Sequence, residues 1–285
     1  MKNLTKENVT QKVLGTLPDD TKPRYREILT SLIEHLHQFV RDVSLTTGEW
    51  LTAMDALYRA GEISNPVRNE FILMSDLLGV SSLVDLINDN DPAATETSPL
   101  GPFFVEDAPM LDPGGDMIEE NDGIQGVVRG HVFNPDGKPI PGAMLEIWQT
   151  AENGLYENVD PDQPKSNLRR RMKTGPEGNY AFTTIQPVSY QVPDDGPGWE
   201  LLEMMGRNPW RPAHLHFKIN AEGFRPLVTE LFVDEDPYID QDVVFGVRNS
   251  LAVSFATNAS QQDADQFNLK APFWQVEFDF KLQSA

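Results

Sequence analysis

The 285-residue chain contains no cysteine, and this absence excludes several kinds of site at once. Disulfide bonds, zinc-thiolate sites, iron–sulfur clusters and thiol nucleophiles all require cysteine. Histidine is also scarce, with five residues in the whole chain. Any metal ion must therefore be held by histidine, carboxylate or tyrosine side chains.

Basic residues are few: 23 Lys and Arg stand against 44 Asp and Glu, for a net charge of -21. Nucleic acids and anionic membranes are bound mainly through Lys and Arg, so neither is expected as a partner. No apolar run approaches the roughly 20 residues that cross a bilayer, and the first residues lack the apolar stretch of a secretory signal. These features favour a cytoplasmic protein that acts on a small molecule.

A helical region is expected from about residue 22 to residue 90. Between residues 24 and 43, apolar residues recur every three or four positions, which is typical of a helix with one apolar face. A second helix should follow Thr46 or Thr47, since either suits the N-cap position, and a third should begin at Pro66. The residues of this third helix expected to face inward are Phe71, Ile72, Leu77 and Leu78. Such a layer needs a partner surface, either the main domain or a second copy of the chain.

Short strands are expected after a polar, turn-rich tract that runs from residue 88 to residue 99. They are separated by Gly and Pro, as in a β-sandwich. The expected strands are 127–133, 143–148, 179–184, 213–220, 228–233 and 273–281. The sequence therefore predicts a mainly β protein, with an N-terminal all-α region and linker over residues 1–98 and a β-sandwich domain over residues 99–285.

The His-x-His pair of His214 and His216 is the first candidate for a metal site. On a strand, successive side chains alternate between the two faces, so both imidazoles point the same way. His35 and His37 have the same spacing but lie on an expected helix, where residues two apart do not face one ligand. His131, on the first expected strand, is interpreted as structural.

Two long, proline-rich loops, residues 153–172 and 186–212, carry Tyr156 and Tyr190. Loops of this length in a compact domain are usually functional. Phenols are protonated at neutral pH and become anionic ligands only beside a highly charged ion such as Fe(III). Two histidines with two tyrosines therefore suggest a non-haem ferric iron site, whereas Tyr180 alternates along a strand and is expected in the core.

Two groups of arginines have a possible role in the sequence: Arg211, and the run from Arg169 to Arg171. Arg211 precedes the His-x-His pair and could position or stabilise a developing anion. The run Arg169-Arg170-Arg171 is expected to be solvated or paired with carboxylates in so acidic a chain. A glycine-rich phosphate loop, a nucleophile elbow and a His-Glu-x-x-His helix are all missing from the sequence, which counts against nucleotide and serine hydrolases.

The run from Gly206 to Phe217, which includes Trp-Arg-Pro-Ala-His-Leu-His, resembles the intradiol ring-cleavage dioxygenases. The segments Gly154–Tyr156, Gly178–Phe182 and Tyr190–Pro197 resemble the same family, in the same order and spacing. The resemblance spans nearly the whole chain. It implies that the β-sandwich is the catalytic domain and that the all-α region joins two copies into a homodimer, sometimes with phospholipid bound between them.

The resemblance also implies a chemistry for the candidate ligands. The family holds non-haem Fe(III) through residues that correspond to Tyr156, Tyr190, His214 and His216, and the aromatic diol binds the iron through both oxygens. Tyr190 would then leave the metal and help to take up a proton, while Tyr156 stays bound. Arg211 would stabilise carbanion character on the activated ring, and both atoms of O2 would enter the product.

Within the family, the segments 73–79 and 99–104 are more similar to hydroxyquinol 1,2-dioxygenases than to catechol or chlorocatechol enzymes. Asp76 would recognise the third hydroxyl of benzene-1,2,4-triol, because a site that hydrogen-bonds a hydroxyl discriminates strongly against analogues without it. The expected product is 3-hydroxy-cis,cis-muconate, or maleylacetate. The expected substrate-binding residues are Leu73, Asp76, Pro99, Leu100, Gly101, Pro102, Phe103, Val192, Pro193 and Arg211.

One position departs from the family pattern, and three other readings stay open. Glu230 stands where catechol enzymes typically carry Gln, and it is a candidate catalytic residue beside Tyr190 and Arg211. Catechol or chlorocatechol is the alternative substrate. The segment 130–143 also looks like the start of prealbumin-like sandwich modules, which bind ligands without iron. A ferrous site of the cupin kind would use the two histidines with a carboxylate, for which Glu230 is available.

Overall fold

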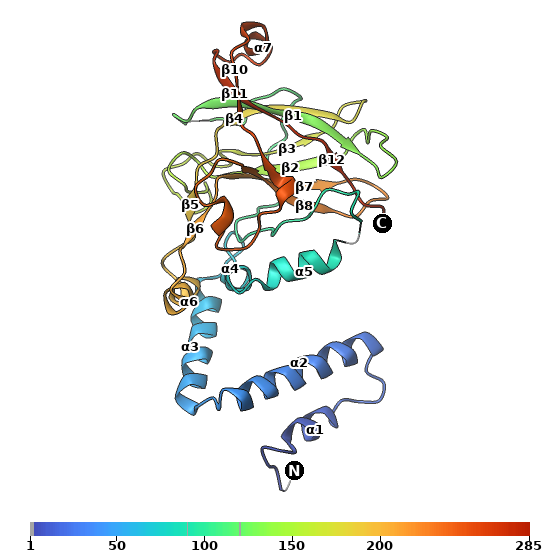
Figure 1. The fold of residues 1–285 in the computed structure, drawn as a ribbon, viewed down its shortest axis with the longest axis vertical. Coiled ribbons are helices and arrows are strands. Elements are labelled where there is room, and N and C mark those ends of the chain that lie inside the picture. Colours follow the sequence, from blue (N-terminus) through green and yellow to red (C-terminus); the bar gives the residue numbers. More distant parts are fainter. Residues whose placement is uncertain (1–2, 90, 120) are drawn as a thin grey trace. The chain divides into compact units, whose positions relative to one another are not determined.

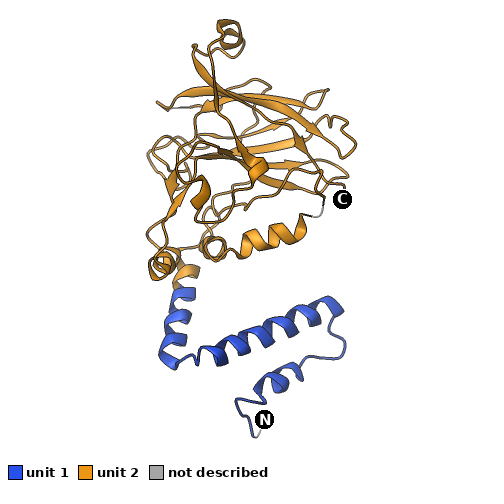
Figure 2. Ribbon diagram, in the orientation of Figure 1, with its two compact units in different colours: residues 1–58 blue, residues 59–285 orange. Residues whose placement is uncertain are grey.

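The computed structural model describes residues 3–89, 91–119 and 121–285. The chain forms two compact units, residues 1–58 and 59–285 (Figure 2). Among the described residues, the regular elements of the first unit are helices, and the strands and every candidate site residue lie in the second. Among the described residues, no helix has both the length and the apolar character needed to span a membrane.

The helical unit contains α1 (Val9–Leu14), α2 (Pro23–Asp42) and most of α3 (Thr47–Ile63). The expected helix over residues 24–43 is confirmed. Thr46 precedes α3, where its backbone N–H donates to Glu49 at 2.8 Å and its hydroxyl accepts from the N–H of Glu49 at 3.3 Å. This reciprocal pair is a capping box, which satisfies free amide groups at the helix start.

The helix expected at Pro66 begins four residues later, so that prediction is wrong. Helix α4 spans Glu70–Leu77 because the side chain of Asn69 accepts from the N–H groups of Phe71 and Ile72, whereas Pro66 lies in the preceding turn. Phe71 and Leu78 are also exposed, at 46% and 57%, rather than inward-facing. The buried face of α4 consists of Glu70, Leu73, Asp76 and Leu77.

The second unit is a sandwich of two five-stranded sheets (Figure 1). The first sheet has the order β10-β11-β1-β12, with β4 on β1. Its strands are β1 (Gln125–Phe133), β4 (Asn179–Ile185), β10 (Ala256–Asn258), β11 (Phe273–Glu277) and β12 (Phe280–Lys281). The second sheet has the order β3-β2-β7-β8-β9. Its strands are β3 (Arg169–Lys173), β2 (Met144–Trp148), β7 (His214–Asn220), β8 (Leu227–Val233) and β9 (Ala252–Val253). The expected mainly β fold is confirmed.

The expected strand over residues 273–281 is split into β11 and β12. The two pieces pair in parallel with β1, but the N–H of His131 donates to the side chain of Asp279 at 2.8 Å instead of to a backbone carbonyl. The ring of His131 also lies beside Asp279, with Nδ1 3.2 Å from its Oδ1. Among the described residues, the group that could hold a metal ion does not include His131.

The remaining elements connect the sheets. The short pair β5 (Tyr190–Gln191) and β6 (Trp210–Arg211) flanks helix α6 (Pro197–Met205), inside what the sequence indicated as one long loop. Helix α5 (Val80–Asn88) follows α4, and α7 (Gln261–Gln266) precedes β11. Two single turns complete the chain, η1 (Ile239–Gln241) and η2 (Asn249–Leu251).

The core lies between the two sheets, and it decides which face of the second sheet carries the site. Leu215, Phe217 and Ile219 of β7 are fully buried in this core, and each such side chain contributes about 1.5–3 kcal/mol. Because side chains alternate along a strand, His214 and His216 must lie on the opposite face. Helices α4 and α5 lie on that outer side of the sheet (Figure 1).

Candidate metal centre and substrate cavity

Four side-chain atoms of the expected metal ligands meet on the outer face of the second sheet. Tyr156 Oη lies 2.9 Å from His216 Nε2 and 3.2 Å from Tyr190 Oη. His216 Nε2 lies 3.1 Å from His214 Nε2. All four residues are at least nine-tenths buried. The structure thus brings together every residue that the sequence indicated as a metal ligand, although they come from separate segments.

Local structure explains how these segments meet. Tyr190 pairs with Arg211 in the β5–β6 ladder, and β6 leads through Pro212 directly into β7. This connection places Tyr190 and Arg211 beside His214. Tyr190 therefore sits on a short strand and not, as the sequence indicated, in an irregular loop.

The two histidines are held in the form that can donate a lone pair to a metal. His214 Nδ1 lies 2.7 Å from the carbonyl oxygen of Pro212, which only accepts, so Nδ1 carries the proton and Nε2 the lone pair. Burial, and next the charge of Arg211, lower the pKa of His214 to about 4. Burial and the neighbouring His214 also hold the pKa of His216 well below its usual value. Both rings are neutral at pH 7.

The two tyrosines are neutral phenols unless a cation is close. Burial, followed by the contact with Tyr190, raises the pKa of Tyr156 well above its ordinary value. Burial raises the pKa of Tyr190 as well, although Arg211 opposes the change. A trivalent cation between the two oxygens would reverse this balance by stabilising the phenolates. Two phenols and two imidazoles facing one point fit a ferric ion.

Arg211 and Glu230 form a buried ionic network beside these ligands. Glu230 is fully buried, and its two oxygens accept from Arg211 at 2.8 and 3.0 Å. The hydroxyl of Ser98 donates to the same carboxylate. On its other side, Arg211 donates to Asp242 at 3.1 and 3.3 Å. Asp242 and Ser98 carried no signal in the sequence, since neither belongs to a recognisable motif.

Burial raises the pKa of Glu230, but Arg211 and His214 outweigh burial, so that the pKa lies below its ordinary value. The carboxylate is therefore ionised at neutral pH. One arginine cation is flanked by two carboxylates, and this trio carries a net negative charge next to the candidate metal ligands.

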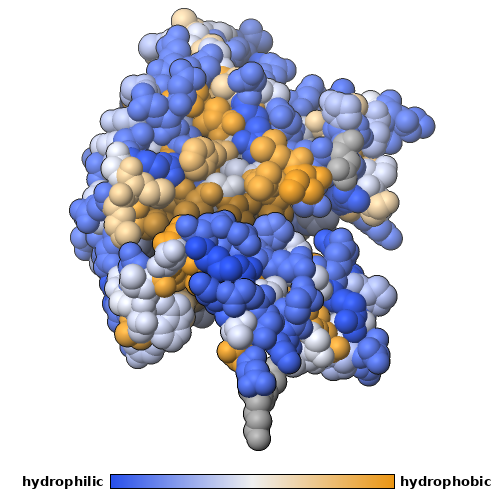
Figure 3. Space-filling view, turned by 60° about the horizontal axis from the view of Figure 1, so that its bottom comes forward, coloured by the Kyte–Doolittle hydropathy of each residue, from blue (hydrophilic) through white to orange (hydrophobic). Residues whose placement is uncertain are grey.

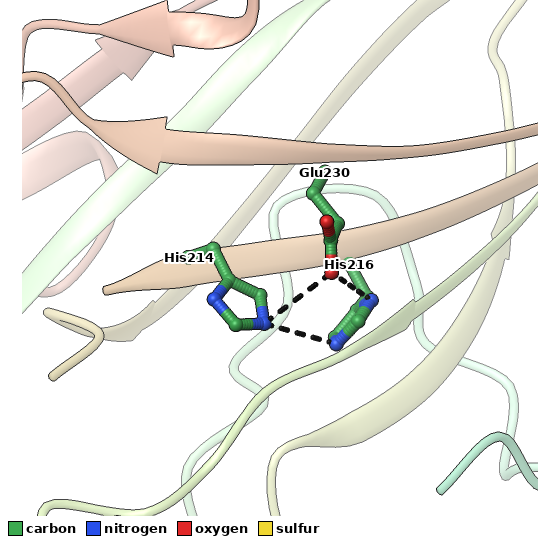
Figure 4. A group of neighbouring side chains, drawn as sticks. All are labelled: His214, His216 and Glu230. Carbon is green, nitrogen blue, oxygen red and sulfur yellow. Dashed lines mark hydrogen bonds and ion pairs between the residues drawn. The ribbon is translucent and has the colours of Figure 1, made fainter. Parts of the chain in front are cut away.

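A second metal arrangement would use His214, His216 and Glu230, whose potential ligand atoms all lie within 4.8 Å of one another. Figure 4 shows the carboxylate of Glu230 turned toward both imidazole rings. Its Oε1 lies 3.1 Å from His216 Nδ1, without hydrogen-bond geometry, and 3.4 Å from His214 Nε2. However, Arg211 Nη1 already lies 2.8 Å from that oxygen and 3.1 Å from His214 Nε2. A cation there would face the guanidinium, so the arrangement with two tyrosines fits a metal better.

A small cavity of about 10 Å³ beside this centre is lined by most of the expected substrate residues. Its lining comprises Leu73, Asp76, Pro99, Gly101, Pro102, Phe103, Tyr190, Val192, Pro193, Arg211 and Val244. Of the expected residues, Leu100 alone is outside this lining, and it packs instead against the cluster of Phe103, Trp148, Tyr156 and Tyr190. Val244 lines the cavity without having been indicated by the sequence. A second pocket of about 380 Å³ reaches Tyr156 and Tyr190 from outside.

Gly101 shows why the segment over the centre needs a glycine. Its φ of +73° lies in the left-handed region, and a Cβ there would lie 3.6 Å from His216 Cε1. The backbone therefore passes close to the imidazole ring. A larger residue would strain the turn that closes the cavity.

Asp76 projects a carboxylate into this cavity from α4. It is 1% exposed, and its Oδ1 has no hydrogen-bond partner within the described part of the chain. Burial raises its pKa to about 7. An unpaired acceptor in a cavity is available to a ligand hydroxyl.

Asp236 connects two of the ligand-bearing segments. Its Oδ2 accepts from the hydroxyl of Ser189 at 2.5 Å and from the N–H of Ala213 at 2.9 Å. Ser189 precedes Tyr190, and Ala213 precedes His214. One carboxylate thereby sets the spacing between a candidate phenol ligand and a candidate imidazole ligand, a role that the sequence did not reveal.

Comparisons with known proteins agree with this geometry. The family described as Dioxygenase matches residues 100–284, and the family described as Catechol dioxygenase N terminus matches residues 22–96. A hydroxyquinol 1,2-dioxygenase from Rhizobium sp. (strain MTP-10005) is 41% identical over 97% of this chain and 95% of its own. A catechol 1,2-dioxygenase from Candida albicans is 38% identical over 86% of this chain and 83% of its own.

Solved structures show the same likeness. A hydroxyquinol 1,2-dioxygenase from Pseudomonas putida DLL-E4 has a TM-score of 0.86 and 42% identity, over 98% of this chain and 99% of its own. The matches cover both the helical and the β-sandwich parts, which favours an enzyme over a prealbumin-like binding module. The chain belongs to the intradiol ring-cleavage dioxygenases, in the branch that contains the hydroxyquinol and catechol 1,2-dioxygenases.

Proposed function

We propose that this protein cleaves hydroxyquinol, benzene-1,2,4-triol, between its two adjacent hydroxyl-bearing carbons. O2 supplies both oxygen atoms that enter the product, 3-hydroxy-cis,cis-muconate or its keto form maleylacetate. The observation that carries this choice is the unpaired Oδ1 of Asp76 in the cavity that Tyr190 and Arg211 also line. Relatives named hydroxyquinol 1,2-dioxygenase support it.

The cofactor in this proposal is non-haem Fe(III), held by Tyr156, Tyr190, His214 and His216. The short distances between their oxygen and Nε2 atoms support this ligand set. When bound, the ion withdraws charge from a coordinated diol and makes the ring reactive toward O2. The protein supplies a buried site in which these electrostatic effects are strong.

Tyr190 is assigned to accept a proton from the diol as the substrate binds. Among the two phenols it alone lines both the inner cavity and the outer pocket, and at 7% it is the more exposed, against 2% for Tyr156. With the ion bound, Tyr190 would be the ligand able to give way to a substrate oxygen, because it lies beside the cavity. Tyr156, deeper in the site, would remain a ligand as the phenolate.

Arg211 is assigned to stabilise negative charge on the activated ring. Its guanidinium lines the cavity, 3.1 Å from His214 Nε2, and it is held in place by Glu230 and Asp242 on two sides. A cation fixed in advance stabilises developing charge without reorganising. Glu230 then acts through Arg211 and is a positioning residue rather than a metal ligand.

The test is ring cleavage by the full-length protein loaded with Fe(III), followed by O2 consumption and by product absorbance. Hydroxyquinol, catechol and 4-chlorocatechol are compared for wild type and for Asp76→Ala. A hydrogen bond to a charged group contributes about 1.5–3 kcal/mol, so loss of Asp76 should lower kcat/KM for hydroxyquinol by roughly 10- to 100-fold. Catechol turnover should change little.

Asp85→Ala is the matched control, because Asp85 is a partly buried carboxylate of the neighbouring α5 that does not line the cavity. It should leave the preference among diols unchanged. If Asp76→Ala lowered kcat/KM equally for hydroxyquinol and catechol, Asp76 would not be the residue that recognises the third hydroxyl. A wild-type preference for catechol or chlorocatechol would replace hydroxyquinol as the substrate.

We also propose that the protein is a homodimer joined through its N-terminal helices, with phospholipid bound between them. Apolar side chains remain exposed on α2, which supports burial against another surface; they include Leu32, Leu36, Phe39 and Val40. In the second unit, α5 exposes a further apolar set (Figure 3): Leu83, Val84, Leu86 and Ile87. Light scattering of the purified protein gives its mass directly, and a monomeric mass would contradict this proposal. A cytoplasmic location stays a prediction.

A further inference from the structure

Four residues form a single row across the second sheet. Arg169 of β3 is the register partner of Trp148 of β2, Trp148 is that of His216 of β7, and His216 is that of Glu230 of β8. Residues opposite each other in a sheet share a face. The indole of Trp148 stacks on the imidazole of His216, with ring centroids 4.6 Å apart and planes within 6°. This row carries one candidate ligand, and its far end is Arg169.

Arg169 reaches from this row to the segment of another candidate ligand. Its Nε and Nη2 donate to the two oxygens of Glu157 at 2.8 and 3.0 Å, and Glu157 directly follows Tyr156. The side chains are 3% and 7% exposed, so the pair is shielded from water. Two parallel charged hydrogen bonds fix orientation as well as distance. The pair thereby attaches the Tyr156 segment to the sheet row that holds His216.

The neighbouring arginines of the same strand form pairs that touch no ligand segment. Arg170 pairs with Glu119, whose side chain is 49% exposed. Arg171 pairs with Asp107, whose side chain is 87% exposed. The run Arg169-Arg170-Arg171 was expected to be solvated or paired with carboxylates, and all three arginines are paired. Of these three pairs, Arg169–Glu157 is the one in which both side chains are buried. The carboxylates of the other two pairs are exposed to water, so those pairs contribute less than one buried on both sides, which makes them internal controls for the Arg169–Glu157 pair.

We propose that Arg169 and Glu157 are positioning residues for the metal centre, and that their ion pair sets the location of Tyr156 relative to His216. This inference rests on the proposed ferric site. Tyr156 Oη and His216 Nε2 are 2.9 Å apart, and a ligand set must be held within about 0.5 Å to bind its metal well. Asn158 holds the other side of the Tyr156 segment by donating to the carbonyl oxygens of Val67 and Phe103. Without the ion pair, the segment keeps the Asn158 bonds and the two bonds that the carbonyl of Leu155 accepts from Ala151 and Gln163, but it loses its link to the row that holds His216.

The experiment compares Glu157→Gln with Glu119→Gln in the full-length protein. The first readout is the visible tyrosinate-to-iron charge-transfer band of the Fe(III)-loaded protein, together with the rate at which a chelator removes the iron. Glu157→Gln should shift or weaken the band and speed iron loss at least tenfold. Glu119→Gln should match wild type within twofold. A Glu157→Gln variant that lowers the unfolding temperature but keeps both iron readouts unchanged would overturn the inference in favour of a purely structural role.

A second readout does not depend on iron. Amide hydrogen exchange of the iron-free protein should rise over residues 153–163 in Glu157→Gln and stay unchanged there in Glu119→Gln. A wild-type protein without any tyrosinate band would refute the proposed ferric site, while the exchange data would still decide whether Glu157 orders the segment.

Arg169→Lys keeps the positive charge but has no planar fork to match the carboxylate. It should shift the charge-transfer band and speed iron loss in the same direction as Glu157→Gln, but by a smaller amount. It replaces Glu157→Gln in the test if that variant does not fold. Wild-type values in Arg169→Lys would show that charge alone suffices and would overturn the geometric role.

Discussion

Replacement of Glu230 by Gln tests the ionic network behind the metal centre. The change keeps the shape of the side chain but removes its charge. Wild-type Glu230 accepts from Arg211 with both oxygens, at 2.8 and 3.0 Å, and also accepts from the hydroxyl of Ser98. A glutamine has one oxygen for these donors, and its amide nitrogen would have to face an N–H group or the Ser98 hydroxyl.

The expected cost follows from the burial of the pair. Arg211 is 3% exposed and Glu230 is fully buried, and removal of one partner of a buried ion pair costs about 3–5 kcal/mol. Asp242 still pairs with the guanidinium from its other side. The free energy of unfolding should therefore fall by about 3 kcal/mol, the lower end of this range.

Urea unfolding of the iron-free protein at pH 7 measures this cost. Glu146→Gln is the control on the same sheet, because Glu146 faces Lys218 at 3.4 Å in a less buried pair, and its loss should cost less than about 1 kcal/mol. A cost below about 1 kcal/mol for Glu230→Gln as well would refute the reasoning.

The pH dependence gives an independent check. The pKa of Glu230 in the folded protein lies below its ordinary value of 4.5. Its ionised form therefore stabilises the fold at every pH above about 4.5, and this contribution is lost as the pH falls through the folded pKa. The stability difference between wild type and Glu230→Gln should shrink below pH 4.5.

Three further changes test other parts of the structure. Asp76→Asn should stabilise the iron-free protein against urea unfolding by on the order of 2 kcal/mol at pH 8 and by less toward pH 4. Burial raises the pKa of Asp76 to about 7, so its ionisation at pH 8 destabilises the folded state. A stability difference that does not change with pH would contradict this. Ser189→Ala should shift the tyrosinate-to-iron band, since it frees one of the segments held by Asp236, and an unchanged spectrum would show that Asp236 needs only its backbone bonds. Tyr180→Phe should cost about 1 kcal/mol in urea unfolding and leave the colour of the iron-loaded protein unaltered, because the Tyr180 hydroxyl donates to the carbonyl of Phe278 at 2.8 Å, away from the centre.

Local patterns along the chain were sufficient to predict most of the strands and to show that the two histidines of the His-x-His pair share a face. Alternation over residues 213–220 correctly placed both imidazoles on one face, because the period of two belongs to any strand. Tyr180 was correctly assigned to the core for the same reason. The absence of cysteine also limited the possible metal ligands to histidine, carboxylate and tyrosine side chains.

The misplaced start of α4 illustrates a competition that the sequence left undecided. Pro66 and Asn69 both suit a helix start, and the observed choice depends on Asn69 accepting two backbone N–H groups. Helix α6 and strand β3 were hidden in loops for a related reason. Short elements are stabilised by tertiary packing more than by their own propensity.

Residues whose role depends on distant contacts had no signal in the chain. Asp242 and Asp236 are single acidic residues among 44 Asp and Glu. Their importance comes from Arg211 in one case and from Ser189 and Ala213 in the other. Only the folded chain shows which carboxylates lie beside a candidate ligand segment.

The sequence by itself determined the fold class and the residue types available to a metal, because strand periodicity and composition are local properties. Tertiary structure alone decided that Tyr156, Tyr190, His214 and His216 meet at one point, and that Glu230 faces Arg211. These contacts join residues far apart in the chain, and they depend on which strands pair and in which register. A shift of one residue in the pairing of β7 would turn both histidines into the core.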